Sequence, residues 1–280
     1  MGEQLFLFVQ MEFPWELGPA DGRYLLRASL DGQAEHVVVL NTLGAERHTR
    51  RRAAKSQRVE GDCEPARVLV ARATIIDPVP VGSERQAQAW LKDVEAERHS
   101  DAAAATLNRV LFYHRIATAD PHVHEVSPAQ AIAIRAGWGD GEQVAYGRFH
   151  DARELPLSQP RWRRRSSALR PQERLAVLLG GRGAALICEE LTLRARLDYD
   201  QGRLMLAALE LERAYVKALS ELREEQRTDL EERIAELEQL RGAVEQLAMA
   251  EEPDPESLRQ PLERLEAALR ARTAVGFQQQ

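Results

Sequence analysis

Cysteine is scarce in this sequence. The 280 residues include only two, Cys63 and Cys188, and these lie far apart in the chain. Small exported domains that depend on disulfides carry several cysteine pairs, and zinc ribbons need closely spaced pairs. The sequence therefore excludes a disulfide-stapled scaffold and a zinc ribbon. Two isolated cysteines are typical of a protein in a reducing cytoplasm.

Long apolar runs are also missing. No uncharged stretch approaches the ~20 residues that span a bilayer as a helix. The apolar run 5–9 is too short for a signal peptide and lacks the positive charges that precede one. We therefore expect no membrane partner and a cytoplasmic location.

Lysine is nearly absent, whereas arginine and alanine are frequent. Three of the 38 cationic residues are lysines, which leaves 35 arginines. This imbalance is typical of GC-rich codon usage and favours a bacterial source, so an arginine cluster carries little information by itself. Residues 171–280 carry 15 Lys or Arg against 22 Asp or Glu, a net charge of −7, and the whole chain has −6. Nucleic-acid affinity depends mainly on neutralising phosphates, so nucleic acid is not the expected partner.

Recognisable catalytic and cofactor-binding motifs are missing too. The sequence has no P-loop ending in Gly-Lys-Ser/Thr, no His-Glu-x-x-His and no Gly-x-Ser-x-Gly. The glycine-rich stretch 137–141 matches neither the P-loop nor the Gly-x-Gly-x-x-Gly motif, the two glycine patterns that bind phosphates. We interpret it as a turn. We expect no cofactor, and the lack of such motifs favours a protein that is not an enzyme.

One group of residues keeps an enzyme open as an alternative. His122 and His124 form a His-x-His pair, Glu125 follows them, and His114 ends the helix predicted before them. Two imidazoles two positions apart in an extended segment point to one side, and His and Glu are ordinary ligands of Zn²⁺. These four residues predict a metal site for a metal-dependent hydrolase. In the competing interpretation, His114 lies on the apolar face of its helix as a core residue.

Two basic stretches offer a second alternative. Their arginines are Arg50, Arg51, Arg52, Arg163, Arg164 and Arg165. Arginines neutralise phosphates, and an interleaved aromatic ring such as Trp162 can stack on a base. The stretches predict a regulator that binds nucleic acid or another polyanion. The competing interpretation is a pair of solvated loops.

The first part of the chain has the alternation of β-strands. Apolar residues alternate with others over 4–13, 23–30 and 36–43, and a fourth run covers 67–76. Proline and glycine cluster between these runs. The pattern predicts an antiparallel sheet of three or four strands.

Helical periodicity follows the fourth run. Over 84–118, apolar residues recur three and four positions apart, which predicts one kinked helix or two. Ser127 and Pro128 form a start signal and Gly137 a stop signal, so we predict a further helix between them. We predict that residues 138–157 are mostly irregular.

A basic, aperiodic segment divides the chain. We predict a β-rich α+β domain over 1–157, a basic linker over 158–170 and an all-α domain over 171–280. The predicted fold class is α+β: a small antiparallel sheet with packed helices, followed by an all-α arm that ends in a long antiparallel helical hairpin.

The two helices expected around Gly202 resemble one hairpin of a tetratricopeptide repeat. Ala195, Gly202, Ala207, Leu211 and Ala214 stand where that repeat has small residues or leucine. Two charged residues interrupt its apolar positions, and no second copy occurs at the required period. We therefore predict an ordinary αα-hairpin.

The end of the chain predicts a coiled-coil-like hairpin. Residues 204–249 contain no proline and one glycine, and 256–272 repeat leucine at the spacing of a coiled coil. A helix as long as 204–249 needs a partner along its length, and the shorter return helix covers only part of it. The residues predicted to remain free as an interaction surface are Leu219, Leu222, Leu230, Ile234 and Leu237.

These features favour a non-enzymatic interaction, adaptor or scaffolding protein. We expect its C-terminal helices to form a homodimer or to bind another protein. The metal-dependent hydrolase and the polyanion-binding regulator remain the alternatives.

Overall fold

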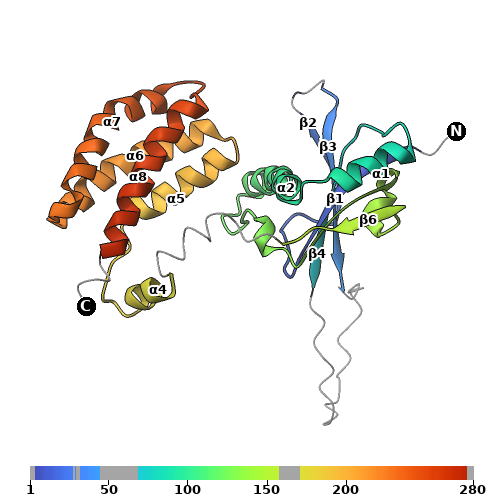
Figure 1. The fold of residues 1–280 in the computed structure, drawn as a ribbon, viewed down its shortest axis with the longest axis horizontal. Coiled ribbons are helices and arrows are strands. Elements are labelled where there is room, and N and C mark those ends of the chain that lie inside the picture. The colour runs from blue at the N-terminus through green and yellow to red at the C-terminus, as the bar shows by residue number, and fades with distance from the viewer. Residues whose placement is uncertain (1–3, 28, 30–31, 45–68, 158–170, 276–280) are drawn as a thin grey trace, which may run out of the picture. The chain divides into compact units, whose positions relative to one another are not determined.

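The structure is a computed structural model that describes residues 4–27, 29, 32–44, 69–157 and 171–275. The chain divides into two compact units, residues 1–160 and 161–280. The first unit combines a sheet with helices, and the described part of the second is helical (Figure 1). The α+β class predicted from the sequence is therefore confirmed.

The first unit is built on a six-stranded antiparallel sheet. Its strands are β1 (Leu5–Phe13), β2 (Gly22–Arg27), β3 (Ala34–Leu43), β4 (Val70–Ile76), β5 (Ala133–Asp140) and β6 (Asp151–Glu154). They are ordered β2-β3-β4-β1-β5-β6 across the sheet. The prediction of three or four strands is wrong because the segment expected to be helical or irregular supplies β5 and β6.

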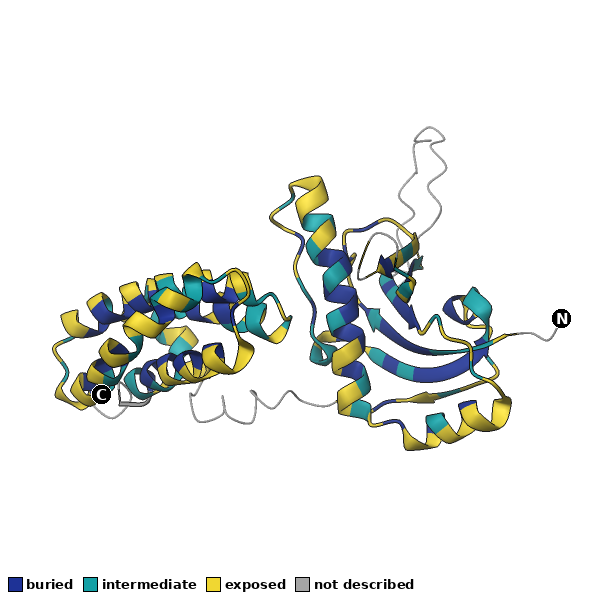
Figure 2. Ribbon diagram, turned by 90° about the horizontal axis from the view of Figure 1, so that it is seen from above, coloured by how far each residue is buried: buried dark blue, intermediate teal, exposed yellow. Residues whose placement is uncertain are grey.

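Strand β1 lies inside the sheet and is buried on both faces. Its odd-numbered residues Val9, Met11 and Phe13 share a core with the helices α1 (Glu84–Asp93) and α2 (Ala96–Thr118). Phe8 points to the opposite face and packs against the 3₁₀ turn η2 (Gly141–Tyr146). Figure 2 shows the buried side of α2 turned toward the buried strands. Alternation in β1 thus supplies two cores, one on each face of the sheet.

Strand β5 corrects the helix predicted between Ser127 and Gly137. The start signal forms only the short 3₁₀ turn η1 (Pro128–Gln130), and the chain then continues as a strand. β5 pairs with β1 along its whole length. Tertiary pairing of this kind outweighs a local helix signal.

The glycine-rich stretch 137–141 belongs mainly to β5 and is not the predicted turn. A Cβ atom on Gly137 would lie 2.5 Å from the backbone oxygen of Asp151 and 2.7 Å from the ring of Phe8. A Cβ atom on Gly139 would lie 2.9 Å from a methyl group of Val144. The glycines therefore let β6 and η2 approach the strand closely.

Five helices form most of the described part of the second unit. They are α4 (Pro171–Leu179), α5 (Ile187–Asp200), α6 (Leu204–Glu224), α7 (Glu231–Met249) and α8 (Pro255–Val275). Helix α6 contacts α5 and α7, and α8 contacts all three of these helices (Figure 1). Helices α5 to α8 share one core, and we call them the bundle.

The continuous helix predicted over 204–249 is wrong. Helix α6 ends at Glu224, Gln226 has a φ of 50°, and the 3₁₀ turn η4 (Thr228–Leu230) leads into α7. A residue in the left-handed region interrupts the hydrogen-bond ladder, so the chain turns and α7 packs against α6. Neither proline nor glycine marks this break, which is why the sequence predicts an unbroken helix. The return helix of the predicted hairpin is α8, and it packs on α5 as well as on α7.

The αα-hairpin predicted around Gly202 is present as α5 and α6. Gly202 has a φ of 71° and follows the end of α5, a position that favours glycine. Ala195 on α5 and Ala207 and Ala214 on α6 are buried. Side chains this small let two helix axes lie close together.

Candidate interaction surface

The residues predicted to form the interaction surface lie in the core of the bundle. Leu219, Leu222, Leu230, Ile234 and Leu237 are each at most 9% exposed. The prediction is wrong because the turn after α6 folds α7 back onto it, and α8 then covers both. These residues stabilise the unit and are not available to a partner.

Other leucines of the bundle are exposed instead. On α5, Leu193 and Leu197 are 67% and 43% exposed, and on α6, Leu206 and Leu209 are each 39% exposed. Helices α5 and α6 are neighbours, and we call these four leucines the outer face. Single exposed apolar residues are common on proteins, whereas several on adjacent helices are typical of a contact surface.

The sequence contained a signal for the outer face. Residues 191–197 and 204–211 are richer in apolar residues than one side of a helix can accommodate. One side of each helix enters the core, so the excess must lie outside it. A search for apolar residues three and four positions apart identifies only the buried side of each helix. It does not identify the additional apolar residues on the outer side.

Charges beside the outer face are paired within each helix. On α5, Arg194 Nε lies 2.9 Å from Glu190 Oε1, and on α6, Arg213 Nη1 lies 3.9 Å from Glu210 Oε1. Each pair has no net charge. These two pairs therefore add no net charge beside the four leucines, whereas residues 171–280 as a whole are acidic.

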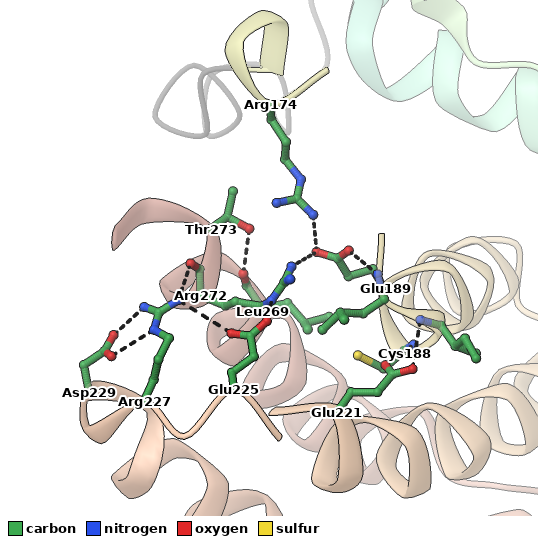
Figure 3. Close-up of polar contacts among 12 residues, drawn as sticks. Arg174, Cys188, Glu189, Glu221, Glu225, Arg227, Asp229, Leu269, Arg272 and Thr273 are labelled. Atoms are coloured by element: carbon green, nitrogen blue, oxygen red, sulfur yellow. Dashed lines mark hydrogen bonds and ion pairs between the residues drawn. The ribbon is translucent and has the colours of Figure 1, made fainter. Parts of the chain in front are cut away.

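Two carboxylates cap the N-terminus of α5 (Figure 3). Glu221 of α6 accepts hydrogen bonds from the backbone N–H groups of Ile187, at 3.2 Å, and Cys188, at 3.0 Å. Glu189 accepts one from the N–H of Leu186 at 2.9 Å. The first N–H groups of a helix have no partner within it, and negative charge is favourable there. Glu221 therefore also ties α6 to the start of α5.

An arginine network joins the same end of α5 to α8 and to the turn after α6 (Figure 3). Arg272 of α8 donates to Glu189 at 3.2 Å and to Glu225 at 2.5 Å. Arg227 donates to the carbonyl oxygen of Arg272 at 2.8 Å and to both oxygens of Asp229. Its hydrogen bonds to the carboxylate lower the pKa of Asp229. Charge-assisted bonds between separate elements hold this corner in one arrangement, so we assign the network a structural role.

Cys188 lies beside the capping carboxylates and is fully buried. Burial raises the pKa of its thiol, and the neighbouring carboxylate of Glu221 raises it further. The thiolate is the nucleophilic form of cysteine, and reactive cysteines have a lowered pKa. Cys188 is therefore suited to packing and not to nucleophilic catalysis.

We expect Cys188 to react very slowly with iodoacetamide in the folded protein. A Cys63→Ser variant leaves Cys188 as the single thiol. Because burial and the raised pKa both keep the thiolate scarce, alkylation at pH 8 should be at least ~100-fold slower than in urea, as measured by mass spectrometry. Equal rates in the two conditions would contradict the environment described for this thiol.

The structure does not bring the predicted metal ligands together. His114 lies half-buried on α2, and His122 and His124 are exposed on either side of the buried Val123. Glu125 follows them and is partly buried. Within the described ranges, no three His, Cys, Asp or Glu side chains are grouped in a way that could hold a metal ion. Both imidazoles are exposed, and they belong to no group of ligands among the described residues.

The predicted polyanion-binding residues cannot be placed in this fold. Arg50, Arg51, Arg52, Arg163, Arg164 and Arg165 lie outside the described residues. The predicted linker 158–170 lies outside them as well. Binding of a polyanion by these arginines stays a prediction.

A hollow of about 500 Å³ lies on the sheet unit between the loop 16–21 and the ends of β3 and β4. Two of its polar side chains already have partners within the unit. Thr42 donates to Asp21 at 2.8 Å, and Arg72 is paired with Glu12 at 2.9 Å. These contacts explain the local structure and do not define a ligand.

An imidazole and a carboxylate meet at the end of β5. His150 Nε2 lies 2.8 Å from Asp140 Oδ2, and the imidazole stacks on the ring of Trp138 at 5.0 Å. The backbone N–H of His150 also donates to the carbonyl oxygen of Trp138. The contacts attach the segment after η2 to β5, which is a structural role.

Among the residues that the structure describes, no helix has the length and apolar character needed to cross a membrane. Comparisons with models of protein families, with curated proteins and with solved structures found no match to this chain.

Proposed function

We propose that this protein is a non-enzymatic adaptor or scaffolding protein that pairs with a second copy of itself through the outer face of the bundle. The observation that supports this proposal is the exposure of Leu193, Leu197, Leu206 and Leu209 on two neighbouring helices. Burying a leucine side chain contributes about 1.5–3 kcal/mol. Covering several of them in one contact therefore favours association.

The charges beside the outer face are compatible with a second copy as the partner. Residues 171–280 have a net charge of −7, so two copies that meet through an average part of this surface repel each other. The outer face is flanked by the pairs Glu190–Arg194 and Glu210–Arg213, which are neutral overall. Two copies meet there without a like-charge penalty. We also propose a cytoplasmic location, because Cys188 is a buried free thiol.

Replacing Leu193 and Leu197 with glutamate should abolish self-association. We expect the full-length protein to have twice its chain mass of 31.5 kDa by size exclusion with light scattering at micromolar concentration. Each substitution removes the burial of a leucine and adds a charge to the contact. Together they should raise the dissociation constant of the dimer more than ~100-fold.

A matched control is Leu179→Glu, because Leu179 is strongly exposed on α4 and is not part of the outer face. It should leave the dimer intact. A monomer for the unsubstituted protein at ~100 µM would refute self-association, since burial of several leucines predicts tighter pairing than that. A dimer that survives both glutamates but dissociates in Leu179→Glu would place the contact on α4.

A further inference from the structure

Helix α4 has no apolar core of its own. It contains nine residues, none of which is buried. Leu175 and Leu179, one turn apart, are 48% and 80% exposed. Isolated helices shorter than ~12–15 residues are marginally stable in water. Val177 and Leu178 are partly buried but do not pack against the core of the bundle. That core therefore does not explain how α4 is held in place.

An ion pair links α4 to the bundle (Figure 3). Arg174 Nη2 lies 2.6 Å from Glu189 Oε1, and the two side chains are 25% and 19% exposed. Glu189 is held in position from the bundle side, because the N–H of Leu186 and the guanidinium of Arg272 both donate to it. The acceptor is thus already oriented whether or not α4 is present.

The chain after α4 permits movement of the helix as one piece. The N–H groups of Gly180, Gly181 and Arg182 donate to carbonyl oxygens in the last turn of α4, which closes the helix locally. Gly181 has a φ of 65°, and Gly183 follows. Glycine adopts many backbone conformations at little cost, so this segment can serve as a hinge.

We propose that α4 is a detachable strap. The Arg174–Glu189 ion pair latches it to the N-terminal end of α5, and the strap opens and closes while the bundle stays folded. Because the latch is a partly exposed pair of charges, salt or a competing anion weakens it. Opening the strap uncovers the carboxylate of Glu189 and separates α4 from the bundle.

Hydrogen exchange of the full-length protein, read by mass spectrometry, tests the latch. Arg174→Gln removes the charge and keeps a good helix former. The backbone amides of α4 should exchange roughly two- to fivefold faster in this variant, which is the range expected for a partly exposed ion pair. Raising the salt from 0.05 to 1 M, the chosen test concentrations, should have a similar effect on the unsubstituted protein. The amides of α5 to α8 should not change in Arg174→Gln.

Arg194→Gln is the control, because it removes an ion pair of α5 that does not involve α4. It should leave exchange in α4 unchanged. Exchange in α4 as slow as in the bundle, and insensitive to Arg174→Gln, would show that other contacts hold the helix. Exchange in α4 that is already unprotected before any substitution would show that the latch does not close. Either result overturns the proposal.

Discussion

Leu237→Ala should lower the free energy of unfolding of the helical unit by about 2–5 kcal/mol. Leu237 is 1% exposed and belongs to the core that α6, α7 and α8 share. Removing most of its side chain forfeits apolar burial and leaves a cavity that neighbouring helices fill only in part. Urea unfolding followed by circular dichroism at 222 nm measures the loss, because the bundle supplies much of the helical signal.

The control for this substitution is Leu193→Ala on the outer face. Leu193 is 67% exposed, so its truncation should change the stability of the monomer by less than ~0.5 kcal/mol. The comparison separates a core residue from a contact residue. If both variants lowered the free energy of unfolding by a similarly small amount, Leu237 would not be a core residue. That result would support the exposed position predicted from the sequence.

Gly137→Ala should destabilise the sheet unit by about 1–3 kcal/mol. The added methyl group would lie 2.5 Å from the backbone oxygen of Asp151 and 2.7 Å from the ring of Phe8. Backbone at this distance must move, and the pairing of β5 with β6 moves with it. Trp15, Trp90 and Trp138 belong to this unit, so unfolding followed by tryptophan fluorescence reports on it.

Gly242→Ala is the matched control, with an effect of opposite sign. Gly242 lies inside α7, and a Cβ atom there meets nothing within 4 Å. Alanine favours a helix over glycine by about 0.5–1 kcal/mol, so this variant should stabilise the helical unit. Destabilisation by Gly242→Ala, or no effect of Gly137→Ala, would contradict the packing described for the respective glycine.

Part of the fold follows from local pattern. The alternation predicted over 4–13, 36–43 and 67–76 corresponds to β1, β3 and β4 to within a few residues. The helical pattern predicted over 84–118 begins with α1 at Glu84. The side chain of Ser83 caps this helix by accepting a hydrogen bond from the N–H of Gln86. An alternating strand and a helix cap both depend on residues that are close in the sequence. The sequence can therefore predict them.

Strand β5 shows that local sequence patterns do not always predict secondary structure. Residues 127–137 carry a start and a stop signal for a helix, yet β5 forms because β1 offers it a complete row of backbone partners. In the sequence, Gly137 and Gly139 resemble turn residues, but in the fold they allow β6 and η2 to approach β5 closely. Such a role depends on residues distant in the chain, and a glycine by itself does not reveal which neighbour approaches.

The candidate surface was misplaced for a related reason. Periodicity identified Leu219, Leu222 and Leu237 as one apolar side, and that side is indeed apolar. The break near Gln226 decides which helices cover this side. Gln226 is a non-glycine residue with positive φ, and no local pattern in the sequence predicts it. The surface that remained exposed, at Leu193 and Leu197, was the part that a single apolar stripe does not explain.

The sequence by itself determined the α+β class, the apolar side of most elements and the acidic character of the helical half. These properties depend on the order of neighbouring residues and on composition. Only the tertiary structure decided which apolar side is covered, which glycines are needed for close packing and which carboxylates cap α5. Those properties depend on elements that meet in space, and the free energy of their contacts exceeds the local preferences that a sequence displays.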